Sequence, residues 1–287
     1  MTFYALISPW LIGFVLLGAI PLALGLLMSF TNYDGLNLDY LQFVGLDNYR
    51  RAFSDPDALH SMQRTLVFVG AAVSLGLVVQ LGLALLLDQR IRFQGAFRTL
   101  FYLPYVIPVV AGAWIWKIFT DPNGGLLNAL LGFVWPDISV HWIVQQPTLV
   151  LVLFTVWAAA GGGMVQNIPA QLREAAMIDG AGSAQVLRFI TLPLLTPVIL
   201  FQLIVSMIGA LQILMQPLLL APGLLGPGTL PPRDNYLYVV HAYNQIFVNQ
   251  LFGYGSALLW LLFLVALGLT LVVFRTSRFW VHYEAAL

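Results

Sequence analysis

The feature that most constrains the fold is a series of long runs without a charged side chain. No Asp, Glu, Lys or Arg occurs in residues 1–33, 65–87, 99–116, 197–232 or 235–274. A transmembrane helix needs about 20 apolar residues. Lipid admits only helices and closed barrels, because every backbone N–H and C=O must be paired within the protein. The runs are continuously apolar rather than alternating, which excludes barrel strands. The sequence therefore predicts an all-α membrane protein.

Composition supports this class and the runs give the number of spans. Of the 287 residues, 60% are hydrophobic and 8% are charged, whereas soluble domains carry about 25% charged residues. We expect a single transmembrane domain over residues 1–287 that crosses the membrane six times. The first span is too long for a signal-peptide core and lacks a small-residue cleavage site, so we interpret it as retained. The predicted spans are roughly 3–30, 65–87, 99–118, 147–166, 195–220 and 252–274.

The distribution of charge predicts the orientation. One set of connections holds seven of the twelve basic residues: Arg90, Arg92, Arg98, Arg173, Arg188, Arg275 and Arg278. The other set holds five basic residues and eight of the twelve acidic ones. Cytoplasmic connections are enriched in Lys and Arg, so the first set is predicted to be cytoplasmic. An even number of spans then places both termini on the cytoplasmic side.

The sequence offers no chemistry of its own for energising transport. A phosphate-binding loop needs a glycine-rich turn followed by lysine, and the only lysine, Lys117, lies in a tryptophan-rich span end. There is no cysteine, and His60, His141, His241 and His282 are scattered among the connections without metal-ligand spacing. We predict no catalytic residue and no metal site, and we do not expect an enzyme. A subunit driven by a partner protein and a stand-alone secondary transporter or channel both remain open.

Residues 167–193 form a charged, glycine-punctuated connection between two apolar runs. Residues 171–178 are mostly helix formers, and Gly180 suits a left-handed helix stop. Ser183 can cap a second short helix, which Pro193 is expected to end. The pattern fits an amphipathic connector on the membrane surface or a helix that docks into a groove of another protein.

This connection resembles the cytoplasmic EAA loop of the membrane subunits of bacterial ABC importers. The matching residues are Glu174-Ala175-Ala176, Asp179-Gly180-Ala181, Ile190, Leu192 and Pro193. Other stretches, among them "VGLDNYRRAFSDPD" and "FGYGSALLWLLFLV", are similar to carbohydrate permeases of the maltose/glycerol-3-phosphate type. The resemblance covers nearly the whole chain. It implies a type I ABC importer permease fold with six transmembrane helices, embedded in the bacterial cytoplasmic (inner) membrane.

The resemblance also implies how the loop works and which partners surround it. The loop would be a coupling helix, in which Glu174 anchors the contact, Ala175 and Ala176 form a close-contact face, and Gly180 sets the turn. The ATPase-coupling residues would be Glu174, Ala175, Ala176, Asp179, Gly180 and Ala181. The implied partners are a second homologous permease, two ATP-binding-cassette ATPase subunits, an extracytoplasmic solute-binding protein and a sugar. ATP and Mg would be bound by the ATPase subunits, so no cofactor is expected in this chain, and no nucleic acid.

The fifth predicted span carries an unusual set of polar and small residues. Gln202, Ser206, Gly209, Ile213 and Gln216 follow one another at steps of four and three, which is one helical face. Small and amide residues also hold membrane helices together, so packing is the alternative interpretation. The resemblance places Ser206, Gly209, Ala210 and Ile213 at solute-contacting positions. No charge lies on this face, which favours a neutral sugar or polyol over a phosphorylated cargo; glycerol-3-phosphate or another polyol is the alternative.

Two further expectations concern the fourth span and the outer connections. The fourth span is shorter than the corresponding span of the permeases that the chain resembles, and it contains Gly161, Gly162 and Gly163, which suit close helix packing or a hinge. For this reason no solute contact is carried over to it. The connections 32–63, 121–146 and 220–250 are expected to form the docking face for a binding protein.

Overall fold

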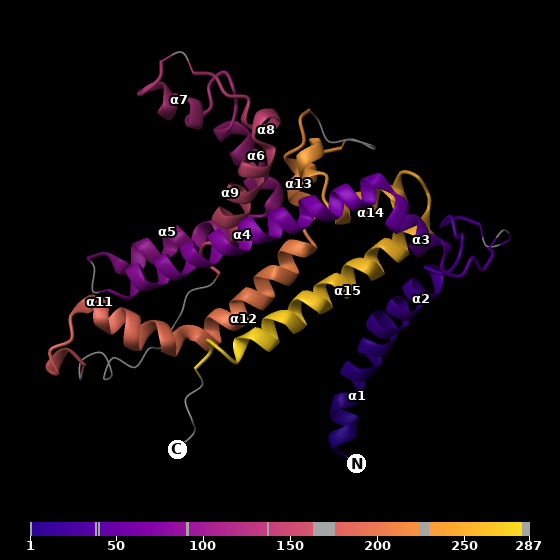
Figure 1. Ribbon diagram of the computed structural model, residues 1–287, viewed down its shortest axis with the longest axis horizontal. Coiled ribbons are helices and arrows are strands. Elements are labelled where there is room, and N and C mark those ends of the chain that lie inside the picture. Colours follow the sequence, from indigo (N-terminus) through magenta and orange to yellow (C-terminus); the bar gives the residue numbers. More distant parts are fainter. Residues whose placement is uncertain are drawn as a thin grey trace. The chain divides into compact units, whose positions relative to one another are not determined.

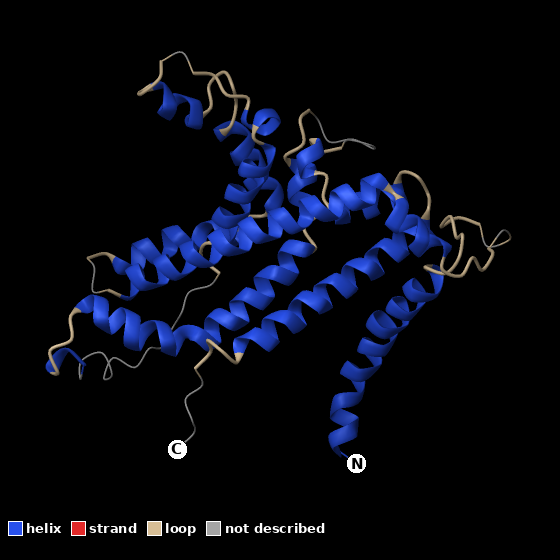
Figure 2. Ribbon diagram, in the orientation of Figure 1, coloured by secondary structure: helices blue, strands red, loops and turns tan. Residues whose placement is uncertain are grey.

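The computed structural model describes residues 2–37, 39, 41–89, 92–136, 138–162, 176–223 and 230–282. Within these ranges the regular structure is helical and no strand is formed (Figure 2). Two π-helical turns, η1 (Val15–Ala19) and η2 (Leu187–Thr191), join consecutive helices, and η3 (Arg233–Asn235) is a 3-10 turn. The helices in chain order (Figure 1) are α1 (Thr2–Phe14), α2 (Ile20–Met28), α3 (Asp47–Ser54), α4 (Pro56–Asp88), α5 (Gln94–Val106), α6 (Val109–Phe119), α7 (Leu126–Gly132), α8 (Trp142–Gln145), α9 (Pro147–Ala159), α11 (Ser183–Val186), α12 (Leu192–Leu211), α13 (Met215–Leu219), α14 (Tyr238–Phe247) and α15 (Phe252–Ser277).

The chain divides into two compact units. The first contains α1, α2, α3, α14, the beginning of α4 as far as Thr65, and α15 as far as Val265. The second contains α4 from Leu66, the helices from α5 to α13, η3, and the end of α15 from Ala266. The candidate site described below lies entirely within the second unit.

Four helices are long and apolar enough to cross a membrane, namely Leu6–Met28, Pro56–Asp88, Ser183–Leu211 and Phe252–Ser277. The bent pair of α5 and α6 gives a fifth span if the two helices cross together. In the fourth predicted span, α9 is a shorter apolar helix, and that span's last residues, 163–166, lie outside the described residues. The all-α prediction is confirmed for the described part of the chain, which holds four or five candidate spans.

The third predicted span, 99–118, is not one continuous helix. It consists of α5 and α6, which meet at an angle of 102°. The chain turns at Ile107, whose backbone is extended with φ −65° and ψ 129°. The ring of Pro108 disfavours the helical conformation at the residue before it and supplies no N–H. The sequence run is uniformly apolar on both sides of this proline, so hydrophobicity alone could not locate the break.

Pro193 does not end a helix, contrary to the sequence-based expectation. Residues Ser183–Leu211 form one helix that passes through η2. In the π-helical turn the N–H of Leu192 bonds the carbonyl of Leu187, five residues earlier. This widened turn accommodates the missing N–H of Pro193 near the start of α12. Ser183 is the first residue of α11 and does not cap it; instead the Oε1 atom of Gln185 accepts a 2.8 Å hydrogen bond from the N–H of Gly182.

The fifth predicted span, 195–220, is broken near its C-terminal end. Helix α12 ends at Leu211, and α13 begins at Met215. Pro217 explains the break, because a continuous helix would need a hydrogen bond from its N–H to the carbonyl of Ile213. The predicted helical face therefore continues only to Gly209, because Ile213 lies on a bend and Gln216 on a separate short helix.

In the first unit, close approaches hold together the C-terminal end of α2 and the N-terminal ends of α3 and α15. Asn48 donates through Nδ2 to the carbonyls of Ser29 (2.9 Å) and Thr31 (2.8 Å). Gly253 donates its N–H to the carbonyl of Tyr33 at 2.9 Å. A Cβ atom at Gly253 would lie 2.0 Å from the Thr31 carbonyl oxygen, so only glycine fits there.

Candidate functional site: a neutral cavity in the second unit

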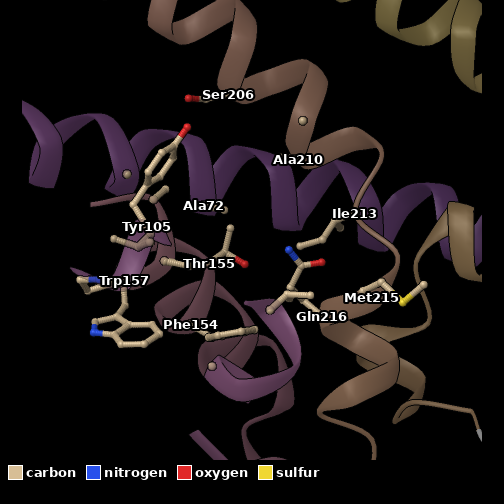
Figure 3. Close-up of a pocket in the computed structure, with 18 of the residues that line it drawn as sticks. Ala72, Tyr105, Phe154, Thr155, Trp157, Ser206, Ala210, Ile213, Met215 and Gln216 are labelled. Atoms are coloured by element: carbon tan, nitrogen blue, oxygen red, sulfur yellow. The ribbon is translucent and has the colours of Figure 1, made fainter. Parts of the chain in front are cut away.

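The second unit contains a cavity of about 620 Å³ (Figure 3). Its walls are formed by α4, α5, α6, α9, α12 and the chain from Gln212 to Gln216. None of the described lining residues carries a charge at neutral pH. The lining side chains with polar groups are Gln80, Tyr105, Thr155, Trp157, Ser206, Gln212 and Gln216.

An aromatic cluster forms one wall of the cavity. The rings of Phe154 and Trp157 are stacked with centroids 6.2 Å apart, and Trp116 packs behind them at 6.0 Å and 6.2 Å. Gly112 makes room for this cluster, since a Cβ there would lie 3.1 Å from Phe154. Tyr105 also borders the cavity, and Figure 3 shows its hydroxyl directed toward the end where Ser206 lies. Flat apolar faces beside hydroxyl and amide groups can stack against and hydrogen-bond a polar, uncharged ring.

The structure brings five of the six predicted pathway residues to this cavity. Ser206, Gly209 and Ala210 reach it from α12, Ile213 from the bend and Gln216 from α13. They converge because the helix breaks, and not because they share one helical face as predicted. Whether they contact a solute stays a prediction.

Gln202, the sixth predicted residue, does not line the large cavity. It lies in a small cavity of about 120 Å³ between α4 and α12. Its Nε2 donates to Ser206 Oγ at 3.3 Å. Gln202 therefore reaches the large cavity only through the hydroxyl of Ser206.

Sequence reasoning missed lining residues from three other helices. Gln80 on α4, Tyr105 on α5 and Trp157 on α9 all border the cavity. A signal existed for Gln80, which is the only amide in the uncharged run 65–87, because a polar group inside a membrane span is often functional. No comparable signal marked Tyr105 and Trp157, because aromatic residues are frequent in this chain, at 13%.

The end of α9 is packed tightly against α5. A Cβ at Gly161 would lie 2.7 Å from Tyr102 Cα and 2.8 Å from the Phe101 carbonyl oxygen. A Cβ at Gly162 would lie 2.6 Å from the Tyr105 ring. Close helix packing, one of the two roles predicted for the glycines, therefore accounts for these two positions; Gly163 lies outside the described residues.

The described part of the predicted coupling segment begins at Ala176; Glu174 and Ala175 lie outside it. Gly180 has φ +87°, so the predicted left-handed helix stop is confirmed. The N–H of Gly180 bonds the carbonyl of Met177 (3.1 Å), and that of Ala181 bonds the carbonyl of Ala176 (2.9 Å). These two bonds form a Schellman motif, which satisfies the last carbonyls of a helix. Asp179 and Ala181 flank the glycine and border a shallow hollow with Phe189.

The first unit contains a separate buried polar cluster. His241 on α14 is fully buried, and its Nδ1 lies 3.0 Å from the Tyr236 hydroxyl oxygen. Its Nε2 lies 3.5 Å from Asp55 Oδ2, and the Tyr254 hydroxyl donates to the same carboxylate oxygen at 2.7 Å. The guanidinium of Arg51 covers the Tyr254 ring at 4.2 Å. The cluster connects the start of α4 to α14 and α15.

Burial sets the protonation of this cluster. Desolvation lowers the pKa of His241 below 6.5, and the charge of Asp55 only partly opposes this, so the imidazole is neutral at pH 7. Desolvation would raise the pKa of Asp55. However, the hydrogen bonds from Tyr254 and from the backbone N–H groups of Asp57 and Ala58 outweigh it, and that pKa is lowered. Desolvation, with the charge of Asp55, raises the pKa of Tyr238. Among the described residues no group of His, Asp and Glu side chains could hold a metal ion.

Comparison with known proteins places the chain in a family. No family model matches it. The chain is 37% identical over 292 residues to "Probable ABC transporter permease protein YesP" of Bacillus subtilis, an alignment that covers 98% of this chain and 92% of the relative. It is 30% identical over 290 residues to "sn-glycerol-3-phosphate transport system permease protein UgpA" of Pectobacterium atrosepticum, with 98% and 95% covered. It is 31% identical over 248 residues to "Trehalose/maltose transport system permease protein MalF" of Thermococcus litoralis, with 83% and 80% covered.

The fold is shared with a solved transporter. A chain from the crystal structure of a bacterial ABC transporter involved in the import of the acidic polysaccharide alginate superposes with a TM-score of 0.81. The match covers 96% of this chain and 95% of the other at 23% identity. The sequence relatives, the apolar helices and this shared fold agree. The chain is an integral membrane protein and belongs to the family of ABC transporter permease subunits.

Proposed function

We propose that the chain is the membrane-spanning permease subunit of an ATP-driven importer, and that its cargo is a neutral sugar or oligosaccharide. The cavity of the second unit carries this proposal. Its described lining is uncharged and combines an aromatic wall with hydroxyl and amide groups. A sugar has apolar ring faces, which suit the aromatic wall, and hydroxyl groups, which suit the hydroxyl and amide groups of the lining. Relatives named for trehalose/maltose transport support a cargo of this class.

The subunit is proposed to cross the bacterial cytoplasmic membrane six times, with both termini in the cytoplasm. The fourth span would begin with α9 and continue beyond Ala159. The third would be the bent pair of α5 and α6. The charge distribution of the connections supports this orientation.

The energy is proposed to come from two ATPase subunits that bind ATP and Mg and contact the segment 174–181. In this proposal Glu174 anchors the contact, Ala175 and Ala176 form its close face, and Asp179, Gly180 and Ala181 shape its end. Two exposed apolar side chains in this segment, Met177 and Ile178, support a covered interface, because Ile178 is 86% exposed in the isolated chain. This chain itself is proposed to hydrolyse no ATP.

The other proposed partners are a second, homologous permease and an extracytoplasmic solute-binding protein. The binding protein would dock on the connections 32–63, 121–146 and 220–250. A solved ABC transporter with the same fold was crystallised with an alginate pentasaccharide-bound periplasmic protein, which supports a partner of this kind. Gln202, Ser206, Gly209, Ala210, Ile213 and Gln216 are proposed to border the solute pathway, Gln202 through Ser206.

A phosphorylated polyol is the second candidate cargo. It is favoured by one observation, the 30% identity to the sn-glycerol-3-phosphate permease of Pectobacterium atrosepticum. An anionic phosphate is normally held by arginine or lysine, and the described cavity lining supplies neither. The two helices that begin at the cavity, α6 and α13, would offer only backbone N–H groups. The neutral cargo is therefore the better match.

The proposal is tested by reconstituting the complete complex in vesicles and measuring ATP-driven uptake of maltose, trehalose and sn-glycerol 3-phosphate. We expect uptake of a neutral sugar, and we expect Ser206→Leu to lower it, because the larger side chain fills the cavity and removes a hydroxyl. Ser206→Ala, which keeps the volume, is the control. Assembly with the ATPase subunits should be unchanged in both variants. Dissociation of the Ser206→Leu complex would show instead that position 206 is a packing position.

A further inference from the structure

Gln80 is a buried amide whose NH₂ group is hydrogen-bonded and whose carbonyl oxygen is not. It lies on α4, is 5% exposed, and lines both the large cavity and the small one beside Gln202. Its Nε2 donates to the carbonyl of Ala159 at 3.0 Å. Its Oε1 is buried and has no hydrogen-bond partner among the described residues.

The orientation of this amide is fixed by chemistry. The carbonyl of Ala159 can only accept a hydrogen bond, so the NH₂ group of Gln80 must face it and the oxygen must face away. The same carbonyl, at the last turn of α9, also accepts the backbone N–H of Gly162 at 3.0 Å, so both of its lone pairs are used. Gln80 thus presents a fixed acceptor, and a buried acceptor without a partner is unfavourable until a donor arrives.

The rest of the cavity defines which donor fits. The described lining has hydroxyl and amide donors but no Lys, Arg or His, and none of its donors bonds Gln80 Oε1. A solute in the cavity can supply the missing donor. A sugar hydroxyl supplies an O–H at no charge. A phosphate group brings acceptor oxygens and negative charge toward a carbonyl oxygen, with no cation to balance them.

We propose that Gln80 is a specificity-determining residue, whose Oε1 accepts a hydrogen bond from one hydroxyl of a neutral sugar and disfavours phosphorylated cargo. The inference rests on the proposed transport function and assigns part of its selectivity to α4. It adds a contact from a helix other than α12, so the solute would be held from two sides of the cavity.

The experiment compares Gln80→Leu with wild type in the reconstituted complex, using ATP-driven uptake of maltose, trehalose and sn-glycerol 3-phosphate. We expect Gln80→Leu to raise the KM for the transported sugar about tenfold. Gln89→Leu, the same change at an exposed position after α4, is the matched control and should transport as wild type does. Size-exclusion chromatography and basal ATPase activity report assembly. Gln80→Met, closer in volume, replaces Gln80→Leu if the latter does not assemble.

Monodeoxy analogues of the transported sugar separate a solute contact from a purely structural role of Gln80. In wild type, removal of one particular hydroxyl should raise KM about tenfold. In Gln80→Leu the same removal should have no further effect, because its partner is already gone. A structural role, such as holding the end of α9, would instead leave the analogue profile unchanged in the variant.

Each outcome is decisive. Uptake of a neutral sugar with equal KM in Gln80→Leu and Gln89→Leu, or with an unaltered analogue profile, overturns the inference and leaves the proposed function standing. Uptake of sn-glycerol 3-phosphate without any neutral sugar overturns the proposed cargo and the role of Gln80 together. Absence of ATP-driven uptake of all three solutes contradicts the proposed function itself.

Discussion

At the scale of single residues, we expect a few buried polar side chains to determine how the stability of the first unit depends on pH. The Tyr254 hydroxyl donates to the Asp55 carboxylate, and His241 Nε2 lies 3.5 Å from the same carboxylate oxygen. This cluster could not be predicted from the sequence, where Asp55 and His241 are 186 positions apart. Asp55 lies in a stretch that resembles carbohydrate permeases, but nothing in that stretch marks it as the neighbour of a histidine. The residue that was predictable is Gly180, because a glycine after a helical run predicts a left-handed stop.

The buried histidine predicts a pH dependence. The pKa of His241 is lowered in the folded chain, so near pH 6 the unfolded chain binds a proton that the folded chain resists. The free energy of unfolding should therefore fall as the pH decreases below 6.5 and level off below the lowered pKa. Thermal unfolding in detergent between pH 8 and pH 5 measures this. His241→Gln should flatten the profile in that range, and exposed His282→Gln should preserve it; the reverse pattern would contradict the assignment.

Removal of the carboxylate tests the same cluster. In Asp55→Asn the Tyr254 hydroxyl loses a charge-assisted acceptor and His241 loses the charge beside it. We expect a loss of about 1–3 kcal/mol in the free energy of unfolding, seen as a lower thermal midpoint. Exposed Asp39→Asn is the control. An unchanged midpoint in Asp55→Asn would show that the cluster contributes little.

At the scale of helices, prolines and not hydrophobicity determine where the helices bend or end. The apolar runs predicted where helices occur, but the 102° bend between α5 and α6 and the end of α12 at Leu211 both depend on single prolines. Pro193 had the opposite outcome, because a π-helical turn absorbs it. A sequence shows which residues can break a helix, whereas the packing around each one decides whether it does.

The contact between α9 and α5 gives a prediction at this scale. Gly161→Ala would place a methyl group against backbone atoms of Phe101 and Tyr102, which cannot move aside as a side chain can. Overpacking of this kind costs about 1–3 kcal/mol. Gly82→Ala on α4, where a Cβ meets nothing within 4 Å, is the control. Thermal unfolding should show a loss in the first variant alone, and equal midpoints would contradict the close packing.

The helix stop at Gly180 gives a second prediction. With φ +87°, this position disfavours a β-branched residue, whereas asparagine tolerates the left-handed conformation. Gly180→Val should therefore reduce ATP-driven uptake strongly while the subunit still inserts in the membrane, and Gly180→Asn should retain most of it. Normal uptake in Gly180→Val would count against the proposed coupling role.

At the scale of the whole molecule, fold class and family followed from the sequence, and the shape of the site did not. Uncharged runs and the EAA array were sufficient for an all-α permease. The cavity depended on contributions from several helices, and residues such as Tyr105 and Trp157 become neighbours only through packing. The structure also leaves Leu6–Met28 without a buried residue in its most apolar window, as expected for a helix whose neighbours are lipid or another subunit.

The proposed dependence on partner ATPase subunits predicts how the chain behaves when it is isolated. Reconstituted without ATPase subunits, it should not accumulate maltose or trehalose against a gradient when a proton or sodium gradient is imposed. The complete complex with ATP in the same vesicles is the positive control. Ion-driven accumulation by the isolated chain would contradict the proposed function and favour the secondary transporter.

The gap between α12 and α13 has a consequence for how such a subunit changes over evolutionary time. The last carbonyls of a helix that ends beside a cavity have no partner within the helix, and these polar groups are present whatever the side chains are. Gly209, Ala210 and Ile213 could then be exchanged for other residues without loss of that constant polarity. A change of transported solute would then need only a few substitutions around the cavity, with the backbone unchanged.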